Sequence, residues 1–265
     1  MANEDKNSSF FSKSNDLRNR ILFTVLILSI YRLGTYVPLP GIDPESLKTV
    51  MDSNQKGLLG MFNIFSGGAV QRMAIFALGI MPYISSSIIV QLLTGVSDYF
   101  KNLKEQGELG RKKITQITRY GTVLIATMQS YGVTVFLEKE LMVVVHPGVL
   151  FVFTAIVSMV TGTILLMWLG EKVTERGIGN GISLIIMVGI ISRLPFVIGN
   201  EIRSVLSGNK LFISEIILMG VMFLVICFVV LLTQGTRKIP VQYAKRVVGR
   251  KVYGGQNTHI PLRVN

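Results

Sequence analysis

The sequence predicts an all-α fold, a bundle of helices that crosses a membrane several times. Of its 265 residues, 49% are hydrophobic and only 16% are charged, and the mean hydropathy is +0.52. A typical soluble domain carries about 25% charged residues. The hydrophobic residues also come in blocks, several of them close to the roughly 20 residues that a helix needs to cross the hydrocarbon core of a bilayer. Together these observations indicate a polytopic membrane protein.

The blocks predict six transmembrane helices, at residues 21–37, 73–94, 120–137, 148–169, 180–199 and 212–233. Residues 1–20 are polar, and no small-x-small cleavage pattern follows the first block, so we interpret that block as a membrane span and not as a cleavable signal. The connecting segments are short except for 38–72, 95–119 and the tail from 234. They leave no room for a separate soluble enzyme domain.

The distribution of Lys and Arg predicts the orientation, because cytoplasmic loops carry an excess of these residues. With this set of spans, 19 of the 27 Lys and Arg lie on the same side as the N-terminus and 7 lie on the opposite side. The sequence therefore predicts that both ends of the chain are cytoplasmic. It also predicts that the segment 38–72 faces the outer side.

The polar residues within the spans argue against several kinds of site. The only carboxylate in a span is Glu215, within a turn of the outer end, whereas proton- or sodium-coupled transporters often use carboxylates near the bilayer midplane. The single cysteine, Cys227, excludes a disulfide within the chain and a metal site built on several thiolates. His146 and His259 have no supporting ligands nearby in the sequence, so we expect neither a metal nor a cofactor.

Two glycine-rich segments lie next to the predicted spans. The stretch "GLLGMFNIFSGGAV" (57–70) is apolar, too short to cross a bilayer, and predicted to lie on the outer side. The stretch "TERGIGNGISLI" (174–185) has the glycine density of a dinucleotide-binding loop, but that site needs a preceding strand and a soluble crossover unit. We interpret 174–185 as a cytoplasmic turn followed by a helix whose glycines permit close packing.

The second span contains Pro82, which we expect to kink or break the helix, as membrane helices tolerate where the break faces protein or a water-filled cavity. Ile80 and Ile84 lie four residues apart, and Ile182 and Ile186 repeat that spacing at the start of the fifth span. By spacing alone these four isoleucines are packing or lipid-facing residues.

The tail, residues 236–265, is strongly basic. This composition fits attraction to anionic lipid headgroups, and it equally fits docking of an acidic partner or of RNA phosphates. The stretch "VVGRKVY" followed by Gly254 and Gly255 is typical of a short strand and turn.

Several uncommon stretches resemble one protein family. "FNIFSGGA", "FALGIMPYIS", "GRKKI", "TRYGT", "LMWLGE", "TERGIGNGIS" and "YAKR…GRKVY" follow one another here in the same order as in the SecY/Sec61-alpha family, and the similarity runs from about residue 17 to the last residue. That family forms the channel of the general secretion translocon from two inverted five-helix halves. The resemblance implies a cytoplasmic segment (1–20), the first half with helices one to five (21–199), an outer loop with the sixth helix (200–233) and a basic cytoplasmic loop (234–265). Since the family continues beyond "HIPLRVN", we expect a truncated chain.

The resemblance also implies site residues. A pore ring would include Ile80, Ile84, Ile182 and Ile186, and the polar side of a lateral gate would include Ser85, Ser87, Gln91 and Gln129. The segment 57–70 would be the plug that seals the idle pore, with Leu58, Leu59, Met61, Phe62, Ile64, Phe65, Ser66, Gly67 and Gly68. The basic tail would dock the motor ATPase SecA or the ribosome through Arg237, Lys238, Lys245, Arg246, Arg250 and Lys251. A weaker candidate for the same surface is Lys101, Lys104, Arg111, Lys112 and Lys113.

The function that the resemblance implies is a passive protein-conducting channel in the bacterial plasma membrane, and not an enzyme. The implied partners are SecE, SecG, SecA, the translating ribosome, unfolded secretory polypeptides with their signal sequences, and membrane lipids, but not DNA. Two other classes stay open from the residues. A secondary transporter of small solutes would need charged or unwound binding residues near the midplane. A membrane anchor would only hold the basic tail at the surface.

Overall fold

The computed structural model describes residues 4–43, 46–47, 63, 66–208, 211–241, 246–248, 251–253 and 258–263. It divides into two compact units, Met1–Val197 and Ile198–Asn265, and each is described here by itself. Helices dominate both units, as expected, and short strands occur in the tail.

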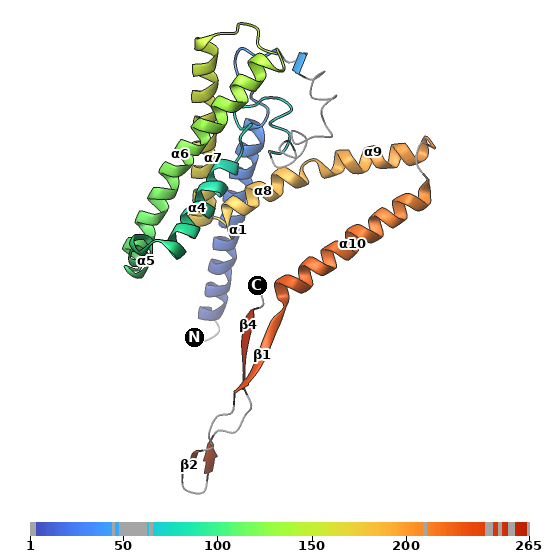
Figure 1. The fold of residues 1–265 in the computed structure, drawn as a ribbon. Coiled ribbons are helices and arrows are strands. Elements are labelled where there is room, and N and C mark those ends of the chain that lie inside the picture. The colour runs from blue at the N-terminus through green and yellow to red at the C-terminus, as the bar shows by residue number, and fades with distance from the viewer. Residues whose placement is uncertain are drawn as a thin grey trace. The chain divides into compact units, whose positions relative to one another are not determined.

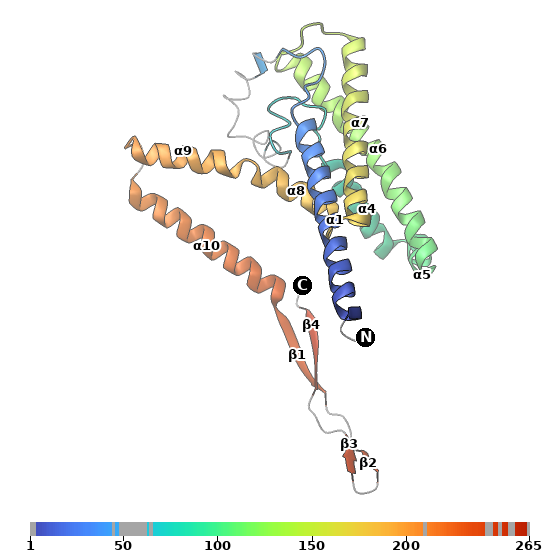
Figure 2. The ribbon, with the colours of Figure 1, turned by 180° about the vertical axis from the view of Figure 1, so that it is seen from behind.

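The first unit is a helical bundle in which neighbouring and more distant helices of the chain pack together (Figure 1). Helix α4 packs against α6, α6 against α7, and α7 against both α8 and α1, so that α7 lies at the centre of the bundle (Figure 2). The bounds of its helices are α1 (Glu4–Gly34), α4 (Met81–Val96), α5 (Asp98–Glu105), α6 (Glu108–Lys139), α7 (Val149–Arg176) and α8 (Gly181–Ile191), and α9 (Leu194–Leu206) begins here and continues into the second unit.

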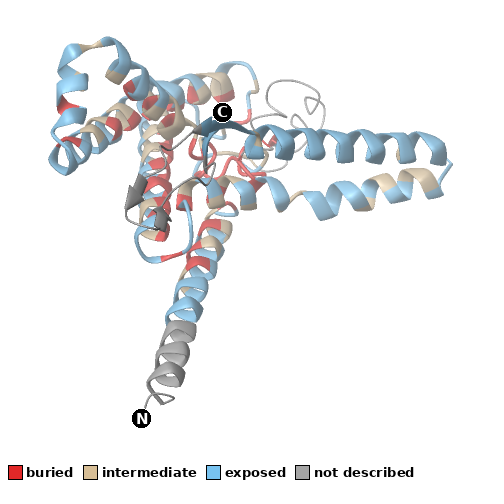
Figure 3. Ribbon diagram, turned by 90° about the horizontal axis from the view of Figure 1, so that it is seen from below, coloured by how far each residue is buried: buried red, intermediate tan, exposed pale blue. Residues whose placement is uncertain are grey.

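Two hydrophobic clusters stabilise the first unit. One joins the loop after α1, at Leu39 and Leu47, to the facing surfaces of α6 and α7, and the other joins α1, α7 and α8 around Tyr31 and Phe76. The segment 66–80 contributes to both clusters, with Ala69 and Ala74 fully buried. Figure 3 shows the buried residues concentrated in this region. A chain of turns, and not a helix, therefore lies in the middle of the bundle.

The second predicted span differs from the structure at its N-terminal end. The hydrophobic block predicts a helix from residue 73, but the chain forms turns up to Ile80, and α4 begins at Met81 with Pro82 in its first turn. Proline is tolerated there because the first N–H groups of a helix have no partner within the helix. Of the two outcomes expected for Pro82, the structure shows the break and not the kink, because the helix of the second span begins only at this proline.

The fifth predicted span is divided into α8 and α9 by a turn at Ser192 and Arg193. Ser192 Oγ donates a hydrogen bond to the Gly189 carbonyl oxygen over 2.7 Å, and Pro195 lies in the first turn of α9. Among the described residues, three helical stretches are long and apolar enough to cross a membrane, namely Val149–Arg176, Gly181–Leu206 and Phe212–Gln234. Helix α4 is apolar but shorter, and α1 and α6 extend beyond their apolar blocks into polar sequence.

The glycine-rich stretch 174–185 forms a tight turn between α7 and α8, as predicted. A Cβ atom on Gly181 would overlap the Gly170 carbonyl oxygen, so the two helices approach backbone to backbone. Asn180 caps α8 by accepting hydrogen bonds from the amides of Ile182 (3.1 Å) and Ser183 (3.3 Å). Thr24 of α1 accepts a hydrogen bond from the Ile178 amide over 3.2 Å. The glycines therefore serve packing, and the element before them is a helix.

The second unit contains α10 (Phe212–Gln234) and the strands of the tail. Strand β1 (Thr236–Val241) pairs antiparallel with β4 (Thr258–Arg263), with Ile239 opposite Ile260. Strands β2 (Arg246–Val248) and β3 (Lys251–Tyr253) form a second, shorter pair, so "VVGRKVY" contains strand structure as predicted, and the turn predicted at Gly254 and Gly255 lies outside the described residues. Helix α10 is apolar except near its ends, where Glu215 lies in its first turn, and it buries none of its residues.

Candidate functional site

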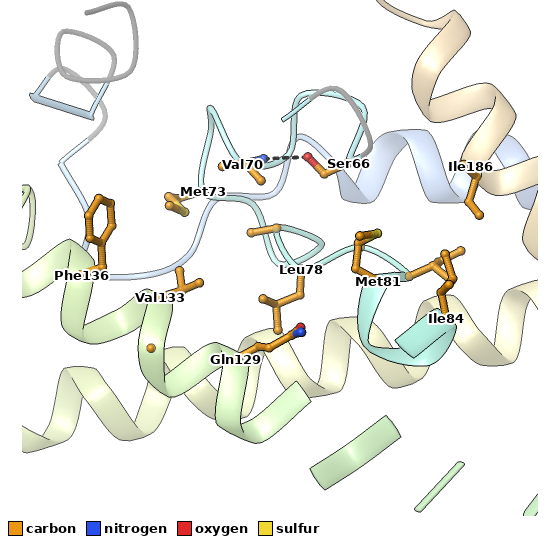
Figure 4. Close-up of a pocket in the computed structure, with 14 residues that line it drawn as sticks. Ser66, Val70, Met73, Leu78, Met81, Ile84, Gln129, Val133, Phe136 and Ile186 are labelled. Atoms are coloured by element: carbon orange, nitrogen blue, oxygen red, sulfur yellow. Dashed lines mark hydrogen bonds between the residues drawn. The ribbon is translucent and has the colours of Figure 1, made fainter. Parts of the chain in front are cut away.

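A cavity of about 710 Å³ lies in the first unit, between the turns of segment 66–80 and the helices α4, α6 and α8 (Figure 4). Met81, Ile84 and Ile186 gather at one end, and Phe136 lies at the other. Nearly all of the lining is apolar, and Ser66 and Gln129 contribute the polar side chains. The full lining comprises Ser66, Val70, Met73, Ala77, Leu78, Gly79, Ile80, Met81, Ile84, Gln129, Gly132, Val133, Phe136 and Ile186.

Local hydrogen bonds give the start of segment 66–80 its shape. The Asn63 carbonyl oxygen accepts from the Gly68 amide over 2.9 Å, and Asn63 Oδ1 accepts from the Gln71 amide over 2.9 Å. Ser66 Oγ, which is buried, accepts from the Val70 amide over 3.3 Å. A side chain that replaces a backbone partner in this way stabilises turns in place of a helix.

Two arginines from the surrounding helices hold the same segment. Arg32, near the end of α1, donates from Nη1 to the Gly67 carbonyl oxygen over 2.7 Å. Arg193, in the turn after α8, donates from Nη2 to Gln71 Oε1 over 2.6 Å. Sequence reasoning assigned neither contact, because the two partners of each bond lie 35 and 122 residues apart in the chain.

Three of the four isoleucines expected in a pore ring come together at the cavity. Ile80, Ile84 and Ile186 line it, although they lie on different elements. Ile182 is absent from the lining and packs instead toward Gly170 of α7. Three branched aliphatic side chains therefore line the same cavity, which is part of the ring that was expected.

The residues expected in the plug fall mostly outside the described part of the chain. This holds for Leu58, Leu59, Met61, Phe62, Ile64 and Phe65. Ser66 lines the cavity, and Gly67 and Gly68 follow it with φ angles of 65° and 91°. These positive angles favour glycine. A Cβ atom on Gly67 would lie 3.0 Å from the Gly189 Cα, so this turn also packs closely on α8.

The four residues expected at a lateral gate separate into two places. Gln129 of α6 lines the cavity, whereas Ser85, Ser87 and Gln91 of α4 do not. Gln91 Nε2 donates to Ser87 Oγ over 3.3 Å, within the same helix. The hydrogen bond between α4 and α6 comes instead from Ser86, which is buried and donates to the Thr118 carbonyl oxygen over 2.8 Å. Ser86 lies four residues from both Pro82 and Val90, which are buried on the same face of α4. That spacing was the signal in the sequence that could have indicated that Ser86 is buried.

A second contact that sequence reasoning missed joins α6 to α7. Arg119 donates from Nε and Nη2 to the two carboxylate oxygens of Glu171, over 2.9 Å and 2.7 Å. This fork-to-carboxylate geometry is the strong form of an ion pair. Both residues belong to stretches, "TRYGT" and "LMWLGE", that carried the family resemblance, but nothing in the sequence pairs them.

The basic residues expected to dock a partner occupy the strands of the second unit in part. Arg237 and Lys238 belong to β1, Arg246 to β2 and Lys251 to β3, and Lys245 and Arg250 lie outside the described residues. In the first unit the weaker candidates on α5 and α6 are all exposed. Within the described ranges, no three His, Cys, Asp or Glu side chains come together as metal ligands would.

Comparisons with known proteins agree with this architecture. A family model described as SecY matches residues 74–265. The chain is 48% identical over 253 residues to protein translocase subunit SecY of Buchnera aphidicola. This alignment covers 94% of the chain and 71% of the Buchnera protein. The chain is also 48% identical over 253 residues to the SecY subunit of Escherichia coli K12, and it covers 57% of that protein. It is 47% identical over 264 residues to the SecY subunit of Rickettsia bellii, and it covers 61% of that protein.

Two solved structures share the fold. One, described as "The structure of a protein conducting channel", matches with a TM-score of 0.61 at 20% identity, over 93% of this chain and 53% of that one. The other, described as "Sec61 in the Canine ribosome-channel complex from the endoplasmic reticulum", matches with a TM-score of 0.58 over 85% and 50%. The chain thus spans about half the length of these channel subunits. The family model and the sequence relatives together show that the chain belongs to the SecY family.

Proposed function

We propose that this chain is part of the channel-forming subunit of a protein translocase, and that the 710 Å³ cavity is one side of its pore. The observation that carries the proposal is the convergence of Ile80, Ile84 and Ile186 on a cavity that Ser66 also lines. A constriction lined by branched aliphatic side chains excludes water and ions when nothing fills it. It also offers a passing polypeptide no hydrogen bonds that would hold it back.

In this proposal the segment 57–70 is the plug, and Gly67 and Gly68 are its hinge. The support is that both glycines adopt positive φ angles, which leaves them the widest choice of backbone conformations. The bonds from Arg32 and Arg193 would hold the C-terminal side of the hinge at the bundle while the apolar part moves. In this proposal the apolar segment would stay out of lipid by lying in a protein-lined funnel.

The lateral gate is proposed between α4 and the helices that complete the channel in longer relatives. Ser85, Ser87 and Gln91 would supply polar groups on α4, and Gln129 would face the pore from α6. Polar side chains in membrane helices stabilise interhelical contacts by a modest amount, about 0.6–2 kcal/mol each. Contacts of that size are weak enough to open when a signal sequence enters.

The proposed partners follow from the family. SecE and SecG would complete the complex, and SecA or a translating ribosome would supply the energy, since the channel itself is proposed to be passive and not an enzyme. One structural neighbour comes from a ribosome–channel complex, which supports the ribosome as a partner. We propose the bacterial plasma membrane as the location, with a cytoplasmic N-terminus, because 19 of the 27 Lys and Arg would then face the cytoplasm.

The test uses the full-length protein reconstituted in a planar bilayer without substrate. Deletion of residues 60–69 should raise the idle ion conductance well above that of the wild type, because the apolar seal is lost. Replacement of the same ten residues by a Gly-Ser linker of equal length keeps the connection intact, and it should leak as well. If both variants stay as tight as the wild type, the segment has no sealing role.

A further inference from the structure

We propose that Arg72 and Arg193 form a binding site for a phosphate-type oxyanion against Gly68, with Arg32 as a third positive charge beside it. This inference does not rest on the channel function, because it concerns one face of the first unit whatever passes through the cavity. The three arginines come from separate elements, namely the turn segment 66–80, the turn after α8 and the end of α1.

The missing side chain of Gly68 lets the two guanidinium groups come close together. A Cβ atom built on Gly68 would lie 3.3 Å from Nη2 and 3.4 Å from Nε of Arg193, and 3.6 Å from Nη1 of Arg72. Two guanidinium groups from distant parts of the chain therefore face the same side of one glycine.

The edge that Arg193 presents is the one suited to an oxyanion. Its Nε and Nη2 atoms carry parallel N–H bonds, which match two oxygens of a phosphate or carboxylate. The bond to Gln71 Oε1, 2.6 Å long, uses only one of the two N–H groups on Nη2. That bond also fixes the orientation of the guanidinium, so the remaining donors are held in place before any ligand arrives.

Arg72 is held in position by stacking on an aromatic ring. Its guanidinium carbon lies 4.0 Å above the centre of the Tyr36 ring, and that of Arg32 lies 5.5 Å from the same ring. Stacking on an aromatic face leaves the N–H groups at the edge of the guanidinium free. Within the described part of the chain, no carboxylate forms an ion pair with Arg32, Arg72 or Arg193.

The clustered positive charges favour binding of an anion that is not one of the described side chains of the protein. Three like charges in one place repel one another, and a doubly charged ligand between them relieves that repulsion. Phosphate chemistry fits the geometry, because Arg is the preferred partner for planar, two-point recognition of phosphate oxygens. The phosphate could belong to a lipid headgroup, which suits a site near the proposed outer end of the fifth span, or to free inorganic phosphate.

The first experiment measures binding of radiolabelled inorganic phosphate to the full-length protein in detergent, at constant ionic strength maintained with chloride. We expect saturable binding by the wild type and a loss of affinity of about tenfold or more in Arg72→Gln and in Arg193→Gln, because each removes charged donors. Arg203→Gln is the matched control, since Arg203 is exposed on α9 and the substitution changes the charge equally. It should bind as the wild type does.

The second experiment distinguishes the two sources of phosphate. Native mass spectrometry would count phosphatidylglycerol retained by the protein after release from nanodiscs of phosphatidylcholine and phosphatidylglycerol. Retention that is lost in Arg72→Gln and Arg193→Gln, and that excess phosphate displaces, identifies a lipid headgroup. Phosphate binding without such retention identifies a soluble oxyanion. If the wild type binds neither ligand in a way that depends on these arginines, the proposal is overturned.

Discussion

At the scale of single residues, glycines set how closely the backbones of the first unit approach. Gly162 of α7 faces the carbonyl oxygen of Ile75, and a Cβ atom there would overlap it. Gly181 faces the backbone of Gly170 in the same way. Small residues at helix interfaces are the means by which membrane helices gain close packing, since lipid removes the usual hydrophobic drive between them. The path of segment 66–80 through the bundle therefore depends on a residue without a side chain, Gly162, on the facing surface of α7.

Replacement of Gly162 by alanine should destabilise the protein by about 1–3 kcal/mol, because the added methyl group must displace backbone and not a flexible side chain. The control is Gly95→Ala in α4, where a Cβ atom would meet nothing within 4 Å. That change should be neutral or slightly stabilising, since alanine is the better helix former. Thermal unfolding in detergent compares the two, and equal effects would contradict the packing argument.

At the scale of elements, the turn between α7 and α8 is held by side-chain hydrogen bonds. Asn180 caps α8, and Thr174 Oγ1 accepts from the Gly181 amide over 2.9 Å. A cap of this kind satisfies N–H groups that the helix leaves without partners. The turn also connects to α1 through Thr24, so three elements depend on a few short polar contacts.

Asn180→Ala should lower the free energy of unfolding by about 1 kcal/mol, because both capped amides lose their acceptor. Asn180→Asp keeps a side-chain oxygen at the same place and should retain most of the stability. Denaturant titration of the purified protein measures the difference. Similar losses in the two variants would mean that the cap does not determine the stability of this turn.

The contact between α6 and α7 offers a second test at this scale. Arg119 and Glu171 should show a coupling energy of about 1 kcal/mol in a double-mutant cycle, because their paired hydrogen bonds are well aligned but the arginine side chain is 48% exposed. The cycle uses Arg119→Gln, Glu171→Gln and the double variant. Additive losses in the double variant would show that the two side chains do not support each other.

At the scale of the whole molecule, charge is distributed unevenly between the two proposed sides of the membrane. The basic strands of the second unit carry Arg237 and Lys238 in a described ribbon, and Arg250 follows β2. Contacts between such charges and an acidic or phosphate-bearing surface weaken steeply as salt rises. Partner docking should therefore depend on ionic strength, whereas membrane insertion should not.

For the full-length protein, Arg250→Glu should weaken binding of SecA or of ribosomes, and the loss should be largest at low salt. Lys139→Glu, at the end of α6 on the proposed outer side, changes the charge equally and should leave binding intact. Co-sedimentation with membranes over a range of salt concentrations measures both. Normal binding of both partners by Arg250→Glu would remove that residue from the docking surface.

The sequence predicted the helical class, the family and the turn at 174–185, because hydrophobic blocks and unusual stretches of residues are local signals. It expected a kink or a break at Pro82 but missed the turns of segment 66–80, because an apolar stretch does not reveal whether its backbone is helical. It also missed Ser86, Arg193 and the Arg119–Glu171 pair. Their partners lie 32 residues or more away in the chain, and no spacing rule reaches that far.

The pairing of β1 with β4 has a consequence for how the tail tolerates change. Thr236 lies opposite Arg263, so the ribbon returns the chain to the place where it left α10. Residues 242–257 thus form a closed excursion whose two ends are fixed by the ladder, whatever its length. Insertions and deletions between the two strands cost only the slowly growing entropy of loop closure. A change in the length of the excursion should therefore leave the helices that precede it undisturbed, even where it interrupts docking through Arg246 or Lys251.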